Sequence, residues 1–561
     1  MASTDTAAAT PATTADPRRW WALITVSLGL FMALLDVTIV NVALPTIGDD
    51  LHTSFADLQW VVSAYTLALA VFLVTAGRLG DLFGRKRLFV VGLGVFALGS
   101  MLCALSGDFT FFNLTHIQTL IAARAVQGLG GAIMLPLSLA ILSSTFHGRE
   151  RGIAFGVYGG VTGLATAIGP VLGGLLVEKV NWQSIFWINV PIGIIAIALC
   201  LWSVQESYDT TAPRSIDVFG LVTLSVALFC LVLALIQGND ADKGWTSPYI
   251  LTLFGIAALG LVAFVIGELL LKNPMVDPRL FKNASFTGVA IVAFTLSAGL
   301  YSLFFFLTLY LQNYLGFSPL QAGLRALPLS GLVLITAPLA GAQMHRFGPK
   351  VFLVLGMALM AVGVLLMTRI TTDLSQTAWL VLLPGFILAG LGSGMVNPPI
   401  ADVAVSTVSR DRAGMASGVS SVCRQLGTAF GIACFGAILT SRYNGRVSDS
   451  VKALTVPGVS EEQAKAILDG IVTGLQNAGT FVASTGLRNL PPQFQQFANS
   501  PLFPQIQHIV QSAYIASTVE IFQLGAILLA IGALAALLLV KRSDMRPATE
   551  GEEREAAPIE F

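Results

Sequence analysis

Long apolar runs, separated by short polar stretches, fill the sequence between Trp20 and Val540. Each run is long enough for a helix to cross the hydrocarbon core of a bilayer, which is about 30 Å thick. The pattern predicts fourteen transmembrane helices, at about 20–46, 57–77, 88–106, 117–140, 154–176, 185–204, 217–237, 249–270, 285–311, 321–342, 350–369, 377–399, 414–439 and 517–540.

Composition supports a chain that lies largely within a membrane. Hydrophobic residues make up 55% of the sequence and charged residues 11%, whereas soluble domains carry about 25% charged residues. A soluble globular chain is therefore excluded, and an all-α integral membrane protein is predicted. The five cysteines lie in apolar stretches without ligand spacing, which indicates packing residues rather than metal ligands.

The distribution of Lys and Arg predicts the orientation of the helices. If the N-terminus is inside, the cytoplasmic segments hold 20 of the 31 basic residues, the outer segments hold 8, and 3 lie within helices. Cytoplasmic loops of membrane proteins carry the excess of positive charge. Both termini are therefore expected in the cytoplasm, in a multi-pass protein of a plasma (inner) membrane.

The first six and the last six predicted helices repeat one another. Gly128 and Pro136 match Gly390 and Pro398 at an offset of 262 residues, and the match continues without a gap through the following helix. Internal repeats are typical of secondary transporters. The predicted units are a cytoplasmic tail (1–19), an N-terminal six-helix bundle (20–206), two inserted helices (207–272), a C-terminal six-helix bundle (285–540) and a second tail (541–561).

The predicted outer segment 440–516 is far longer than an ordinary connection of about 4–6 residues. Ser460 and Gln463 form the start of a capping box ahead of an amphipathic run. Short amphipathic helices lying over the outer face, which could pair as a hairpin, are expected, with a disordered linker as the alternative.

No sequence signal for nucleotide hydrolysis or enzyme chemistry occurs. The chain has no Walker A pattern, no GxGxxG, no histidine cluster, no metal-ligand spacing and no nucleophile elbow. No enzyme activity, cofactor, metal or nucleic-acid partner is predicted. Pumping would use an ion gradient, and a channel is the alternative.

Asp36 and Arg124 are the clearest candidates for chemistry inside the membrane. Helix geometry of about 1.5 Å per residue places both in the same layer of the outer half of the bilayer. Ionisable groups at such depth are costly and usually functional. We expect Asp36 to carry a proton, with Arg124 coupled to it; a static salt bridge, or neutralisation of a cationic substrate, are the alternatives.

Several other side chains are candidates for a central substrate cavity. Gln127 shares a helical face with Arg124 and would point inward. Arg424 lies on the polar side of its helix near the midplane, and a structural clamp on a carbonyl is the alternative. Tyr301 and Phe305 share a face at i and i+4 and could line an apolar cavity, although packing or lipid contact would explain them equally.

One loop resembles the signature of the major facilitator superfamily. Residues 77–87 read GRLGDLFGRKR. Gly77 and Gly84 would permit a tight turn and close helix approach. Asp81 could pair with Arg85 or with a helix N-terminus and latch the cytoplasmic side, and Arg87 completes the motif.

Three further motifs resemble the fourteen-helix drug:proton antiporters of that superfamily. They are 35–45 (LDVTIVNVALP, with Asn41), 124–132 (RAVQGLGGA) and 165–174 (ATAIGPVLGG, with Gly169, Pro170, Gly173 and Gly174). The resemblance implies that Arg124 acts in proton coupling, that Asn41 lines the cavity and that the third motif marks an exporter. Ala165 departs from the family pattern, which begins with Gly.

The resemblance implies a proton-coupled exporter of lipophilic drugs or antibiotics, acting as a monomer by alternating access. Its partners would be protons, a lipophilic small molecule and membrane lipids. An exporter of a lipid or cell-envelope precursor would share every motif, and a non-transporting membrane sensor is the remaining alternative.

Overall fold

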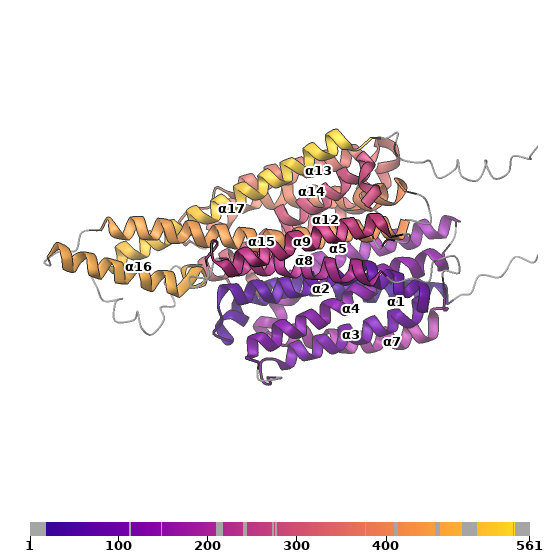
Figure 1. Ribbon diagram of the computed structural model, residues 1–561, viewed down its shortest axis with the longest axis horizontal. Coiled ribbons are helices and arrows are strands. Elements are labelled where there is room, and N and C mark those ends of the chain that lie inside the picture. The colour runs from indigo at the N-terminus through magenta and orange to yellow at the C-terminus, as the bar shows by residue number, and fades with distance from the viewer. Residues whose placement is uncertain are drawn as a thin grey trace, which may run out of the picture.

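The computed structural model describes residues 18–110, 114–146, 148–208, 217–238, 244–271, 274, 276, 278–375, 377–408, 413–454, 460–484, 502–541 and 544. Within these ranges the protein is helical and contains no β-strand. The helices run nearly parallel in an elongated bundle (Figure 1). Most of the predicted tails, 1–19 and 541–561, lie outside the described residues.

The predicted transmembrane segments are confirmed as helices. Thirteen helices in the described part of the chain are long and apolar enough to cross a membrane, and the remaining segment, 154–176, falls within α5. The N-terminal half consists of α1 (Arg19–Asp50), α2 (Phe55–Phe83), α3 (Arg85–Leu105), α4 (His116–Thr145), α5 (Gly148–Lys179), α6 (Ser184–Trp187) and α7 (Asn189–Ser203).

The C-terminal half repeats this arrangement with interruptions. It consists of η1 (Pro278–Lys282), α10 (Ala284–Leu296), η2 (Ser297–Tyr301), α11 (Leu303–Leu309), η3 (Tyr310–Tyr314), α12 (Pro319–Phe347), α13 (Pro349–Met367), η4 (Ala378–Leu382), α14 (Leu383–Ser406), α15 (Ala413–Lys452), α16 (Glu461–Ser484) and α17 (Phe503–Leu539). The segments η2 and η3 are π-helical turns within one apolar run.

Matching glycines give the two halves the same local geometry. Gly84 ends α2 and Gly348 ends α12, and both have positive φ angles, 107° and 83°, which glycine adopts without steric cost. Gly77 faces Pro136 and Gly341 faces Pro398, so the crossings α2–α4 and α12–α14 are built alike. The repeat inferred from the sequence is therefore also a repeat in packing.

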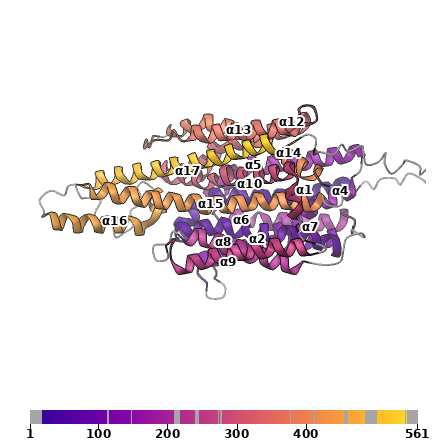
Figure 2. The ribbon, with the colours of Figure 1, turned by 45° about the horizontal axis from the view of Figure 1, so that its top comes forward.

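The inserted helices form a hairpin along the line where the two halves meet. α8 (Val218–Gln237) and α9 (Pro248–Leu270) pack against each other, and α8 also contacts α2 and α15. Apolar side chains from all four helices form one cluster, which includes Val71, Leu228, Phe264 and Ala429. Figure 2 shows the hairpin lying beside α2 and α15.

The long segment 440–516 differs from the expectation of short helices lying over the bundle. The ends of α15 and α17 continue beyond the other helices, with α16 packed beside them, and form a projecting arm (Figures 1 and 2). We define the arm as residues 440–454, 460–484 and 502–516. α15 has 40 residues, about 60 Å of helix, roughly twice the thickness of a bilayer core.

The arm has its own core and polar contacts, which explains why it does not collapse onto the bundle. Val447, Leu468 and Val510 are buried among α15, α16 and α17. At its base Arg446 pairs with Glu520 and donates a 2.8 Å hydrogen bond to Ser517. The predicted capping box is confirmed, because Ser460 and Gln463 bond reciprocally at 3.3 and 3.4 Å.

The two halves are joined by hydrogen bonds at the end of the bundle that carries the arm, which we call the arm end. Gln59 donates to the Ile432 carbonyl at 3.1 Å. Gln312 donates to the Val42 carbonyl at 2.7 Å. Ser318 donates to Glu178 at 2.6 Å. All three of these hydrogen bonds join the halves at the arm end, so this end of the bundle is closed in the structure.

Candidate functional site

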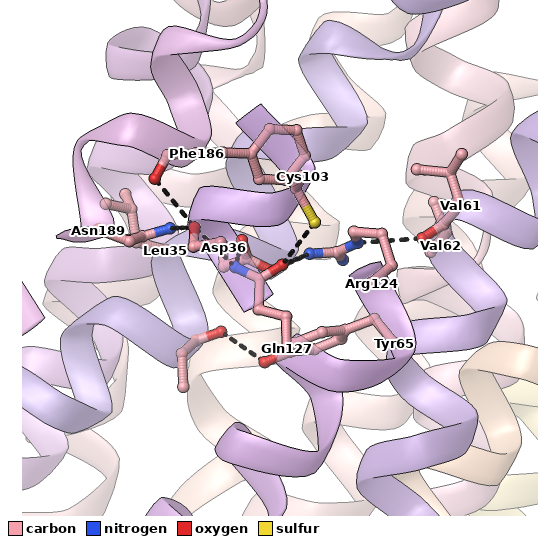
Figure 3. A network of polar contacts seen from close by, with 12 residues as sticks. Leu35, Asp36, Val61, Val62, Tyr65, Cys103, Arg124, Gln127, Phe186 and Asn189 are labelled. Carbon is pink, nitrogen blue, oxygen red and sulfur yellow. Dashed lines mark hydrogen bonds and ion pairs between the residues drawn. The ribbon is translucent and has the colours of Figure 1, made fainter. Parts of the chain in front are cut away.

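A buried polar network in the N-terminal half centres on Asp36 of α1 and Arg124 of α4 (Figure 3). Arg124 Nη1 lies 2.5 Å from Asp36 Oδ2, and the two side chains are 1% and 0% exposed. Gln127 donates to Asp36 Oδ1 at 2.7 Å and accepts from Arg124 Nη1 at 2.6 Å. The structure therefore brings together three of the predicted site residues in one closed triangle.

Neighbouring helices hold the triangle in place. Arg124 Nε donates to the Val61 carbonyl of α2 at 3.1 Å, and its guanidinium carbon lies 4.3 Å from the centre of the Tyr65 ring. Ser100 of α3 accepts from Gln127 at 3.1 Å and from Asn189 of α7 at 3.0 Å. Five helices thus share one hydrogen-bonded unit.

This arrangement can exchange a proton only when water reaches it. An ion pair that is buried and hydrogen-bonded is stable as a pair, but removing one charge leaves the other uncompensated at a cost of about 3–5 kcal/mol. Protonation of Asp36 would remove its charge and leave Arg124 without a counterion. The network is therefore able to link proton binding to a rearrangement of α1 against α4.

The loop at 77–87 is only partly described, since the side chain of Asp81 lies outside the described residues. The visible contacts come from Glu206, which follows α7. Its carboxylate accepts from the backbone nitrogens of Lys86 at 2.9 Å and Arg87 at 3.2 Å. Glu206 therefore caps the N-terminus of α3, where a negative charge is favourable, and holds the chain beside Gly84.

The motif at 165–174 lies where α5 crosses two helices. Gly173 abuts Ile39 of α1, and Gly169 abuts Thr38 of the same helix. On the opposite side, a methyl group added at Gly174 would lie 2.5 Å from the Leu320 Cα of α12, and the Pro170 carbonyl lies against Gly323. The motif therefore forms one of the contacts between the two halves near the arm end.

The predicted cavity residues fall into different environments. Gln127 belongs to the buried triangle and is 0% exposed, and Phe305 is 0% exposed and packs against Phe306 at a ring-centre distance of 5.0 Å. Neither faces an accessible cavity in this conformation. Asn41 is half-buried, and its Oδ1 atom has no hydrogen-bond partner. Tyr301 and Arg424 lie together, with the guanidinium carbon 6.0 Å from the ring centre.

A separate cavity of about 740 Å³ opens between α8, α15 and α17. Its lining includes Trp245, Ile438, Arg442 and Glu520, and it touches neither the buried triangle nor Arg424. This cavity is therefore separate from the residues that we treat as the candidate functional site.

Residues 26–432 match the sequence profile of the Major Facilitator Superfamily. The chain belongs to this superfamily. A Spinster homologue of the same fold, described as inward-facing and unoccupied, aligns with a TM-score of 0.58 at 16% identity and covers 95% of this chain and 99% of its own.

Superfamily members with similar sequences are named as resistance and export proteins. The tetracenomycin C resistance and export protein of Streptomyces glaucescens is 37% identical over 84% of this chain and 85% of its own length. The multidrug transporter protein MdtP of Bacillus subtilis is 31% identical over 94% and 95%. The probable actinorhodin transporter of Streptomyces coelicolor is 36% identical over 77% and 75%. The protein is thus a transporter of the superfamily rather than an enzyme.

Sequence reasoning did not identify several residues that support these sites. Ser100 and Asn189 are polar residues within the apolar runs 88–106 and 185–204. A lone polar residue in a membrane helix indicates a hydrogen-bonding role, so the sequence did contain a signal for these two residues. Glu206 lies in an ordinary polar stretch, so nothing in the sequence distinguished it. The partners of Tyr301, which are Ser393 and Asn397 of α14, follow from helix packing alone.

Proposed function

We propose that this member of the superfamily is a proton-coupled antiporter that exports lipophilic drugs or antibiotics by alternating access. The observation that carries the proposal is the buried triangle of Asp36, Arg124 and Gln127. Intramembrane acids of this kind act as proton carriers in transporters. The printed names of the relatives support drug export as the activity.

In the proposed cycle, the conformation described here is closed at the arm end and receives substrate from the opposite side. When the arm end opens, substrate leaves and water reaches Asp36, which takes up a proton. The protonated state breaks the ion pair with Arg124 and favours return to the closed arm end. Release of the proton on the other side completes the exchange.

The proposed location is the plasma membrane of a bacterial cell, as a monomer with both termini in the cytoplasm and the arm outside. The excess of basic residues on the side of the termini supports this orientation. Bacterial sources of the similar transporters support the membrane assignment.

The decisive test uses purified protein in liposomes with an imposed pH gradient and an internal pH dye. For Asp36→Asn we expect compound-dependent proton flux to fall to the background of empty liposomes, while exchange of substrate without a gradient continues. The matched control is Asp108→Asn, since Asp108 is exposed and its loss should leave flux unchanged. Full flux in folded Asp36→Asn protein would refute proton coupling through this residue.

The arm supports a second candidate function, export of a lipid or cell-envelope precursor. A structure that projects from the membrane could pass such cargo outward. Replacing residues 455–501 by a short linker would then lower export of a labelled lipid without changing dye efflux. Equal loss of both activities would indicate a general role for the arm in folding.

A further inference from the structure

Arg424 is a charged residue in the membrane interior without a counterion in the described structure. It lies eleven residues after the start of α15 at Ala413, about 16 Å along the helix. Among the described residues no carboxylate lies within ion-pair distance of it. No carbonyl accepts a hydrogen bond from its side chain there either, which argues against a structural clamp. Such a charge in the apolar layer is costly and marks a functional site.

The neighbours of Arg424 form a polar cluster built by three segments. The hydroxyl of Tyr301, on η2, accepts from Asn397 Nδ2 at 3.1 Å and lies 3.3 Å from Ser393 Oγ. Asn397 also donates to the Ser393 carbonyl at 2.8 Å. One hydrogen bond from the Asn397 amide fixes Tyr301 beside Arg424, and the other anchors the Asn397 side chain to its own helix. Tyr301 ends a π-helical turn, a feature frequent at functional sites.

The cluster remains partly accessible, unlike the triangle in the other half. Arg424, Tyr301 and Asn397 are half-buried, whereas Asp36 and Arg124 are fully enclosed and neutralise each other. The guanidinium of Arg424 is planar, always charged, and able to bind a carboxylate with two bonds or to stack on an aromatic ring. A ligand of this site would therefore need a negatively charged group to neutralise Arg424.

We propose that Arg424 and Tyr301 form the part of the substrate site that binds an anionic group on an aromatic compound, such as a carboxylate, sulfonate or ionised phenol. Asn397 and Ser393 are positioning residues that hold Tyr301. This inference rests on the proposed export function and names its substrate class. It predicts that anionic aromatic compounds bind better than lipophilic cations of the same shape.

The test measures binding of two ions of nearly equal shape and opposite charge, tetraphenylborate and tetraphenylphosphonium, to the purified full-length protein by calorimetry. We expect the borate to bind at least about tenfold more tightly. Arg424→Gln should weaken borate binding about tenfold or more without weakening phosphonium binding. Arg369→Gln is the matched control, because Arg369 is exposed and its loss should leave both affinities unchanged.

A second variant keeps the test valid if Arg424→Gln does not fold. Ser421→Asp places a carboxylate one turn from Arg424, at a spacing that allows an ion pair, and should abolish the preference for the borate. Equal binding of the two ions by the unmodified protein would overturn the inference. A preference that survives in folded Arg424→Gln or Ser421→Asp would overturn it too.

The binding assay separates this inference from the proposed function. Proton-coupled export of cations, with no preference for the borate, would overturn the anion site and leave the antiporter intact. If the preference for the borate depends on Arg424 but no compound drives proton flux, the anion site would be supported and the proposal of proton coupling would be refuted.

Discussion

Gln127 connects the charged pair to the surrounding helices. It contacts Asp36, Arg124 and Ser100 at once. It lies three residues after Arg124, which places the two on one helical face. A glutamine can both accept from the guanidinium and donate to the carboxylate, and no apolar residue of similar size can do either.

At the scale of single residues we predict that Gln127→Leu destabilises the protein. The substitution leaves Asp36 Oδ1 and one donor direction of Arg124 unbonded in a fully buried site, and each unmet buried group costs about 1–3 kcal/mol. A lowered midpoint in thermal unfolding would show the loss. Gln343→Leu, at an exposed position of α12, should change the unfolding free energy by less than about 0.5 kcal/mol. Equal midpoints for the two variants would contradict the prediction.

At the scale of elements, α5 can pack closely against α12 because its motif has a glycine, Gly174, where the two helices meet. Gly174 lies directly against the backbone of Pro319 and Leu320. Backbone atoms cannot move aside as a flexible side chain can, so an added methyl group must push the helices apart.

We predict that Gly174→Ala weakens closure at the arm end. Spin labels at Lys179 of α5 and Leu324 of α12, both exposed, should report a longer or broader distance distribution by pulsed electron resonance. Gly160→Ala is the matched control, because a methyl group at Gly160 on the same helix meets nothing within 4 Å. An unchanged distribution in Gly174→Ala would show that this crossing does not control closure.

At the scale of the whole molecule, closure of the arm end includes a titratable contact. Glu178 lies just past the apolar segment 154–176. The hydrogen bond from Ser318, and secondarily that from Lys179, holds the pKa of the Glu178 carboxyl below its ordinary value of 4.5. The contact therefore favours the closed state when Glu178 is ionised.

The sign of the pH dependence follows from this lowered pKa. The stabilisation is fully present above the ordinary carboxyl pKa and is lost as the pH falls through the lowered value. We predict that the unmodified protein closes the arm end more fully than Glu178→Gln at pH 7, and that the two converge once the pH falls below the lowered pKa of Glu178. Spin labels on Leu324 and Val180, which leave Lys179 unmodified, measure the difference. A difference that persists at low pH would assign closure to other contacts.

The sequence by itself determined the membrane helices and the common depth of Asp36 and Arg124. Apolar length and helix geometry act locally, since a lipid-embedded helix satisfies its own backbone hydrogen bonds whatever its neighbours are. Depth along a helix is equally local, so two charges could be assigned to one layer. The repeat at an offset of 262 residues also predicted that the chain forms two similar six-helix halves.

Tertiary structure alone decided which faces of these helices meet. The π-helical turns at 297–301 and 310–314 interrupt one apolar run. Within this run Phe305 packs in the core, while Tyr301 meets Arg424. The arm stands away from the bundle because α15, α16 and α17 bury apolar faces on one another. Such choices depend on side chains that are far apart in the chain, and local periodicity does not record them.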